Sequence, residues 1–222
     1  FILLNTGSEI ILNDDGLLTT VAYKYNGKAF YALEGSSYIA GAAVQWLRDN
    51  LSLLDSSSMV EHLANSVQNL ELEMEHLIFM PFFTGIGTPY WNSEAKGAIL
   101  GLTRDTMPKH LARACLDGMA LSINDSIQAI IKHSPTKISE LRVDGGASQN
   151  DTLMQIQANF SQFKIVRPKV VETTAYGVAL GALIGLGKLN ISDIERLWKE
   201  DKDFMPLKNS YVTKKQQQWN HY

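Results

Sequence analysis

A short segment of this chain passes through two adjacent glycines and limits the local fold: Val143-Asp144-Gly145-Gly146-Ala147-Ser148-Gln149-Asn150. The residues before the glycines predict a strand, and those from Asn150 to Phe160 predict a helix. Glycines at such a junction carry no Cβ, so a ligand can approach the backbone, while a helix start offers unpaired N–H groups to an anion. A nucleotide phosphate is the commonest guest of this arrangement, although a lone Gly-Gly pair more often makes only a tight turn.

Strands and helices alternate in the second half of the chain but not in the first, which predicts a mixed α/β fold with an antiparallel portion. In the first half, Asn26-Gly27 indicates a tight hairpin between two of four short strand-like runs. The expected strands are residues 1–4, 9–12, 17–25, 28–32, 76–83, 141–144 and 164–167. The expected helices are 38–49, 59–67, 106–132, 150–160, 173–186 and 193–199, followed by a polar tail. Helix 173–186 is rich in small residues and is expected to pack closely against a partner.

Two further segments bear on ligand binding. In the helix expected at 38–49, Gly41 and Gln45 are four residues apart and so share one face. Gly41 leaves space for a bulky group and Gln45 offers a hydrogen bond, but the same small residues also suit close helix packing. The loop Thr84–Trp91 contains Gly-Ile-Gly, yet it lacks the third glycine and the following helix of a dinucleotide-binding motif, so we interpret it as structural.

Composition and charge exclude several classes of protein. With 222 residues, 45% of them hydrophobic and 19% charged, the chain can bury one sizeable core. A net charge of -3 argues against a nucleic-acid partner, and the longest nearly apolar run, 175–187, is too short to span a bilayer. The single cysteine, Cys115, favours a reducing, cytoplasmic setting. The chain opens at Phe1 without a basic leader, so we expect a strand continued from upstream sequence and no signal peptide.

A series of motifs then follows the order found in one known family of enzymes. They are Asn5-Thr6-Gly7, Gly16-Leu17-Leu18-Thr19-Thr20, Tyr31-Ala32-Leu33-Glu34-Gly35, Gly41 through Gln45-Trp46-Leu47-Arg48-Asp49, Phe83 through Trp91, Gly97 through Arg104, Leu141 through Ala147, and Asn150. Through them the chain resembles the carboxy-terminal domain of the FGGY family of carbohydrate kinases. Segments 31–49 and 83–91 resemble the members that phosphorylate glycerol more than those that act on sugars.

This resemblance implies a fold and a domain organisation. The fold is an actin-like ATPase domain of the ribonuclease H-like type, with a mixed five-stranded sheet and helices on both faces. Residues 1–222 would form the carboxy-terminal, nucleotide-binding domain, and an amino-terminal substrate domain would lie outside this sequence. In the family, two such domains close over a cleft that holds ATP.

The resemblance also assigns roles to individual residues. Gly41, Gln45, Gly146 and Asn150 match nucleotide-binding positions, and Phe1 matches an aromatic residue that lines the glycerol pocket. The catalytic base of the family is an aspartate upstream of the position that matches Phe1. We therefore expect no catalytic residue and no metal ligand among residues 1–222.

The implied activity is transfer of the γ-phosphoryl group of ATP to glycerol, which gives sn-glycerol 3-phosphate and ADP. The implied cofactors are ATP and Mg²⁺, and the implied partners are glycerol, ATP or ADP, the amino-terminal domain and further copies of the same enzyme. Residues 1–222 alone are expected to be inactive. The alternatives are the carboxy-terminal domain of a xylulose or gluconate kinase, and a nucleotide-binding module without catalysis.

Overall fold

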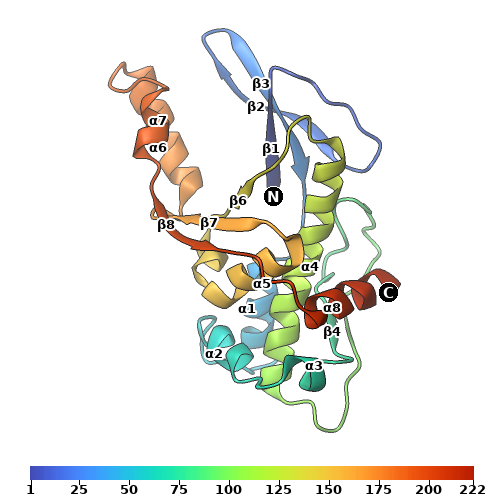
Figure 1. The fold of residues 1–222 in the computed structure, drawn as a ribbon. Helices are drawn as coiled ribbons and strands as arrows, with labels where there is room; N and C mark the ends of the chain where they lie inside the picture. The colour runs from blue at the N-terminus through green and yellow to red at the C-terminus, as the bar shows by residue number, and fades with distance from the viewer.

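The computed structural model describes residues 1–222, and helix α4 (Pro108–His133) runs through the middle of the molecule (Figure 1). From Ala114 to Leu121 every residue of this helix is buried, so this stretch has no solvent face. A helix that is buried all round lies inside a core rather than on its surface. Strands and helices from both halves of the chain accordingly pack against α4.

The remaining elements follow one another in a mixed order. The strands are β1 (Ile2–Gly7), β2 (Leu18–Tyr25), β3 (Lys28–Gly35), β4 (Ile78–Met80), β5 (Ala98–Leu100), β6 (Glu140–Arg142), β7 (Lys164–Pro168) and β8 (Glu200–Phe204). The helices are α1 (Gly41–Asp49), α2 (Met59–Asn65), α3 (Leu70–Glu73), the 3₁₀ helix η1 (Gly146–Gln149), α5 (Asp151–Ser161), α6 (Thr173–Gly185), α7 (Asp193–Leu197) and α8 (Ser210–His221). The mixed α/β class predicted from the sequence is confirmed.

The strands form three small sheets. One is antiparallel with the order β1-β3-β2, the second pairs β4 with β5, and the third has the order β6-β7-β8. In the first sheet Tyr25 pairs with Lys28, and the two residues between them, Asn26 and Gly27, have φ of 46° and 79°. Two positive φ angles are what a two-residue hairpin of this type requires. The hairpin predicted from Asn26-Gly27 is therefore present.

The single five-stranded sheet implied by the resemblance is divided in this structure. No strand pairing joins β1 to β6, which are edge strands of separate sheets. Strand β6 has only three residues and can form few ladder bonds. Ile138, just before it, packs against the small cluster that contains Leu17 and Leu33. The segment that leads into β6 is therefore attached to the β1-β3-β2 sheet by side-chain packing, and no backbone hydrogen bonds join β6 to β1.

The main core lies where α4 meets β4. It contains 29 buried residues, drawn from Ala43 to Ile165 and from Phe204 to Trp219. Gly118 permits the approach, because a Cβ added there would lie 2.0 Å from the carbonyl oxygen of Phe79. A backbone carbonyl in a paired strand cannot move away easily, so only glycine fits at this position.

The segment predicted only as a polar tail forms a strand and a helix, β8 and α8. Strand β8 pairs with β7, and α8 buries Tyr211, Val212, Lys215 and Trp219. The Tyr211 hydroxyl donates to the Asp117 carboxylate on α4, so buried polar contacts hold a helix whose sequence is mostly polar. The strand expected at residues 9–12 is wrong: this segment belongs to no strand or helix.

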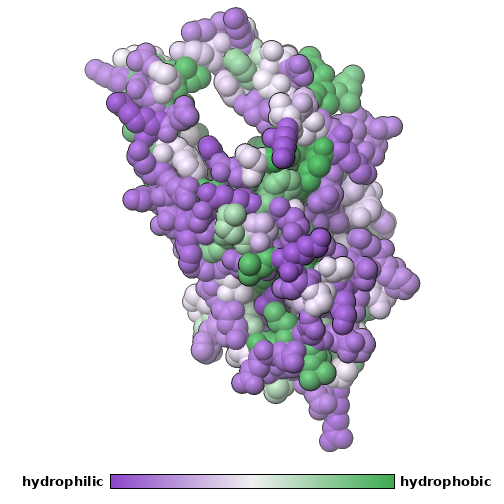
Figure 2. Space-filling view, in the orientation of Figure 1, coloured by the Kyte–Doolittle hydropathy of each residue, from purple (hydrophilic) through white to green (hydrophobic).

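Helix α6 is present as predicted, but the close packing expected for it is not. Only Leu180 is buried on it, and Val178 is 72% exposed. With α7 it forms an arm that stands away from the body, and an open gap separates this arm from the sheet of β1, β2 and β3 (Figures 1 and 2). None of the chain's helices, α6 included, combines the length and the apolar character needed to cross a membrane.

Candidate functional site

The junction of β6 and α5 forms a tight turn that begins at Gly145. Gly145 has φ of 78°, in the left-handed region that favours glycine. Its N–H donates to the carbonyl oxygen of Val171 over 2.7 Å, and Ser148 Oγ donates to the carbonyl oxygen of Gly145 over 2.7 Å. The first glycine of the pair is thus required by the backbone of the turn itself.

The second glycine leaves the turn open to a ligand. A Cβ added at Gly145 or Gly146 would meet no atom within 4 Å, and Gly146 is exposed. The N–H groups of Gly146 and Ala147 donate to no other part of the chain. Free backbone N–H groups beside open space are suited to an anionic group.

The start of α1 lies beside this turn. A Cβ added at Gly41 would lie 3.9 Å from the Cβ of Ala147, so the structure brings together two segments that the sequence separates by about a hundred residues. Ala40 caps α1 without any side-chain hydrogen bond. Gln45 is exposed one turn further along the same helix, and its amide forms no hydrogen bond within the chain. Both predicted positions on α1 are therefore available to a ligand that occupies the turn.

Asn150 has one role that the structure makes plain. It is the N-cap of α5, and its Oδ1 accepts a hydrogen bond of 2.8 Å from the N–H of Leu153. The Nδ2 group of Asn150 has no partner in the chain, so it can still donate to a ligand. The cap fixes the side chain at the end of the turn, so its capping role is compatible with the predicted contact to a nucleotide.

Arg167 stabilises the turn through side-chain hydrogen bonds, and no sequence motif pointed to it. From β7 its Nη1 donates to the carbonyl oxygen of Ser148 over 2.9 Å and to Asp151 Oδ1 over 2.7 Å, while Nε donates to Asp201 Oδ2 over 3.0 Å. The pKa of Asp151 is lowered mainly by its hydrogen bond from Lys202 and to a smaller extent by that from Arg167. Its place in the sequence could have indicated this role. Arg167 is near the end of β7, which runs parallel to β6, and the turn follows the end of β6.

A second link joins the turn to α6. The Thr173 hydroxyl donates to the carboxylate of Asp144, the residue just before the two glycines. No group of three or more His, Cys, Asp or Glu side chains in residues 1–222 is arranged to hold a metal ion. Mg²⁺ commonly takes one or two carboxylates together with substrate phosphates, and Asp144 is the carboxylate adjacent to the turn.

Phe1 and the loop Thr84–Trp91, the other two segments considered in the sequence, lie outside this turn. Phe1 precedes β1 in the antiparallel sheet and is 87% exposed, so it stays a separate prediction for a substrate contact. The loop Thr84–Trp91 is structural: the N–H of Thr88 donates to the carbonyl oxygen of Ser36 over 2.9 Å, and the Trp91 indole donates to the carbonyl oxygen of Gly16. This loop ties the antiparallel sheet to the rest of the chain.

Comparison with known proteins bears on the whole chain. The sequence model described as "FGGY family of carbohydrate kinases, C-terminal domain" matches residues 1–186. A glycerol kinase of Rhodopirellula baltica is 46% identical over 99% of this chain and 40% of the relative. Glycerol kinase 2 of Sulfolobus acidocaldarius is 47% identical over 93% of this chain and 41% of the relative. The chain thus spans about two fifths of the length of the curated relatives that it matches.

Solved structures agree with these matches. Plasmodium falciparum glycerol kinase with ADP has a TM-score of 0.85 and 32% identity, and covers 99% of this chain and 44% of that chain. Gluconate kinase of Lactobacillus acidophilus has a TM-score of 0.77 and 23% identity, over 99% of this chain and 44% of that chain. The second likeness is one of fold alone. The actin-like fold expected from the motifs is confirmed by these neighbours, although the strand ladder between β1 and β6 is absent here.

Proposed function

The chain belongs to the FGGY family of carbohydrate kinases, and on this basis we propose that residues 1–222 are the nucleotide-binding domain of an enzyme that phosphorylates glycerol. The observation that carries the proposal is the turn at Gly145-Gly146, where open space and free N–H groups face the start of α1. ADP is present in the P. falciparum relative. The identities of 46–47% to glycerol kinases favour glycerol as the acceptor over a sugar.

Within this proposal each site residue has a physical task. Gly41 and Gly146 leave room for the nucleotide on the two sides of the opening, and Gln45 and Asn150 supply amide groups that hydrogen-bond it. Backbone N–H groups of the turn hold phosphate oxygens, and Mg²⁺ bound with the nucleotide would supply positive charge against those oxygens. Phe1 contributes an apolar surface against the carbon atoms of glycerol.

The proposal places the catalytic base outside residues 1–222, on an amino-terminal domain that closes over the same cleft. Domain closure would exclude water, which otherwise competes with glycerol for the phosphoryl group. Residues 1–222 alone then bind nucleotide without turnover, and the complete enzyme works in the cytoplasm as an oligomer.

Isothermal titration of ATP and ADP into residues 1–222 tests the nucleotide site. Gly146→Trp fills the opening and is expected to lower affinity at least tenfold. Gly177→Trp on α6 is the matched control, because its Cβ also meets no atom within 4 Å and it lies outside the turn. Equal affinities for the two variants, with unchanged circular dichroism, would remove Gly146 from the site.

The acceptor is tested separately with the full-length protein. ATP-dependent phosphorylation is measured with glycerol, xylulose and gluconate at equal concentrations. A kcat/KM for glycerol at least a hundredfold above that for either sugar is expected. A preference for xylulose or gluconate would contradict glycerol as the acceptor and leave the nucleotide site untouched.

A further inference from the structure

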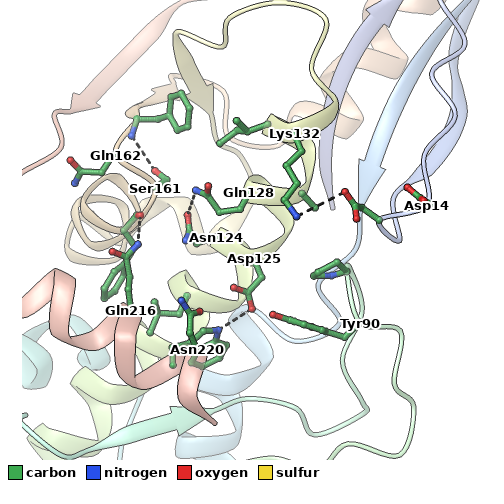
Figure 3. Close-up of a pocket in the computed structure, with 18 residues that line it drawn as sticks. Asp14, Tyr90, Asn124, Asp125, Gln128, Lys132, Ser161, Gln162, Gln216 and Asn220 are labelled. Atoms are coloured by element: carbon green, nitrogen blue, oxygen red, sulfur yellow. Dashed lines mark hydrogen bonds and ion pairs between the residues drawn. The ribbon is translucent and has the colours of Figure 1, made fainter.

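A second cavity lies away from the nucleotide turn and has no role in the proposed function. It has a volume of about 940 Å³ and lies between the second half of α4, helix α8, the end of α5, and the loops at residues 14–15 and 89–90 (Figure 3). None of Gly41, Gln45, Gly146 and Asn150 lines it. A cavity of this size with a few polar groups directed into it is the usual form of a small-molecule site.

The carboxylate of Asp125 is the central charged group of this cavity. Its Oδ2 accepts a hydrogen bond of 2.9 Å from the indole N–H of Trp219, and the other oxygen has no hydrogen bond within the chain. No lysine, arginine or histidine forms an ion pair with it. Burial raises the pKa of Asp125 to about 6, which shows the cost of holding this charge without a partner.

The groups around Asp125 favour a positive charge over a negative one. Figure 3 shows the Tyr90 hydroxyl pointing towards Asp125, the residue that also accepts the hydrogen bond from the Trp219 indole. Asp14 and Asp15 also line the cavity, and its one cationic side chain, Lys132, is directed to Asp15 with a separation of 3.9 Å. Asp15 further accepts from His133 over 2.8 Å. Phosphates and other anions are therefore repelled from the interior.

Amide groups complete the lining. Gln128 Nε2 donates to Asn124 Oδ1 over 3.3 Å, which leaves the Gln128 oxygen free, and Gln216 Nε2 donates to the carbonyl oxygen of Phe160 over 2.9 Å, which leaves the Gln216 oxygen free. These oxygens can accept hydrogen bonds from an N–H donor. The ring of Phe160 and the side chain of Leu121 supply apolar wall for an alkyl chain.

From this arrangement we propose that the cavity binds a small organic ammonium ion, with its charged nitrogen at the free oxygen of Asp125 and its alkyl part between Tyr90 and Trp219. The carboxylate gives the charge, the two aromatic side chains give apolar contact to the alkyl part, and the amide oxygens accept the remaining N–H bonds. The site acts independently of nucleotide binding at Gly145-Gly146.

Putrescine is the probe, and 1,4-butanediol is its neutral counterpart of similar length. In a ¹H–¹⁵N spectrum of the 222-residue chain the four tryptophan indoles give separate signals. Putrescine at pH 7.5 is expected to shift the Trp219 signal in a saturable way and to leave Trp198 unmoved. Butanediol is expected to shift neither. At pH 5 the affinity for putrescine should fall about tenfold, because the Asp125 carboxyl becomes mostly protonated.

Two variants test the assignment of the cavity. Asp125→Asn keeps the shape and removes the charge, and it should weaken putrescine binding at least tenfold. Gln128→Phe places a ring at an exposed position of the lining and should also weaken binding. Asp105→Asn, an exposed aspartate outside the cavity, is the control and should keep the wild-type affinity.

The outcomes are distinct. Failure of putrescine to move the Trp219 signal overturns the proposal, and so does unchanged affinity in a folded Asp125→Asn protein. Equal shifts with butanediol or glucose, without dependence on pH, would overturn it in favour of a site for neutral polyols. None of these results depends on whether the turn at Gly145-Gly146 binds ATP.

Discussion

Helices α4 and α6 are both rich in apolar and small residues, yet they occupy opposite environments. Residues Ala114–Leu121 of α4 are buried all round, whereas α6 buries only Leu180. The difference lies in the partners, because β4 approaches α4 so closely that a Cβ at Gly118 does not fit, while the glycines of α6 face open space. Apolar composition alone therefore does not decide burial. A complementary surface must also be supplied.

The largest difference in stability is expected between a buried aspartate on α4 and an aspartate on α7, which forms the exposed arm together with α6. Asp117 on α4 accepts from Arg113 Nε over 3.0 Å and from the Tyr211 hydroxyl, and it is 3% exposed. Asp117→Ala leaves a buried arginine without its partner and should cost about 4 kcal/mol in unfolding free energy. Asp193→Ala, at the exposed pair with Arg196 on α7, should cost less than about 1 kcal/mol. Urea unfolding measures both; similar losses would remove the contrast.

A glycine to alanine change should lower the stability of the fold when made in α4 and raise it when made in α6. Gly118→Ala brings a methyl group against the Phe79 carbonyl and should destabilise the fold by about 3 kcal/mol. Gly181→Ala on α6 meets no atom and should stabilise the fold by up to about 1 kcal/mol through helix propensity. Thermal and urea unfolding give the two values. A loss at Gly181 would mean that α6 packs closely against a partner in solution.

The two helices should also differ in their response to pH. Burial raises the pKa of Asp125 on α4 to about 6, above its value in the unfolded chain, so the folded state binds the extra proton. Its contribution to stability is complete below about pH 4 and is lost as pH rises through 6. Wild type relative to Asp125→Asn should lose about 2 kcal/mol from pH 4 to pH 7.5. Helix α6 contains no aspartate, glutamate or histidine, so we expect it to make no contribution to the change of stability between pH 4 and pH 7.5. A constant difference across this range would contradict the prediction.

The smallest effect is expected on the exposed face of α6. Val178 is 72% exposed, so Val178→Ser should change the unfolding free energy by less than about 0.5 kcal/mol. The same measurement on the full-length protein tests whether other parts of the enzyme cover this face of α6. A loss above 2 kcal/mol there, and not in residues 1–222, would place α6 at an interface with other parts of the enzyme.

Local patterns predicted the elements that local forces determine. The hairpin at Asn26-Gly27, helices α4, α5 and α6, and the turn at Gly145-Gly146 all follow from backbone preferences or helical periodicity. The position of Gly41 beside this turn followed only from the family resemblance, since the two segments are far apart in sequence. The roles of the individual site residues in binding stay predictions.

Long-range polar contacts could not be predicted in the same way. Helix α8 is anchored by Tyr211 to Asp117 and by Lys215 to the carbonyl oxygen of Leu77 over 2.9 Å, and nothing near these residues in sequence indicates their partners. Arg167 likewise holds the turn through groups on three other segments. Whether β1 pairs with β6 depends on how two separate sheets approach each other, which periodicity does not specify; in this structure they do not pair.

The bond from Tyr211 to Asp117 has a consequence for synthesis on the ribosome. The two residues are 94 positions apart, so α4 emerges long before the hydroxyl that completes its buried carboxylate. At translation rates of about 5–20 residues per second this interval lasts roughly 5 to 20 s. During that time Asp117 has Arg113 as a partner within α4 but lacks its contact to α8. This part of the core should therefore stay open to chaperones until α8 has left the exit tunnel.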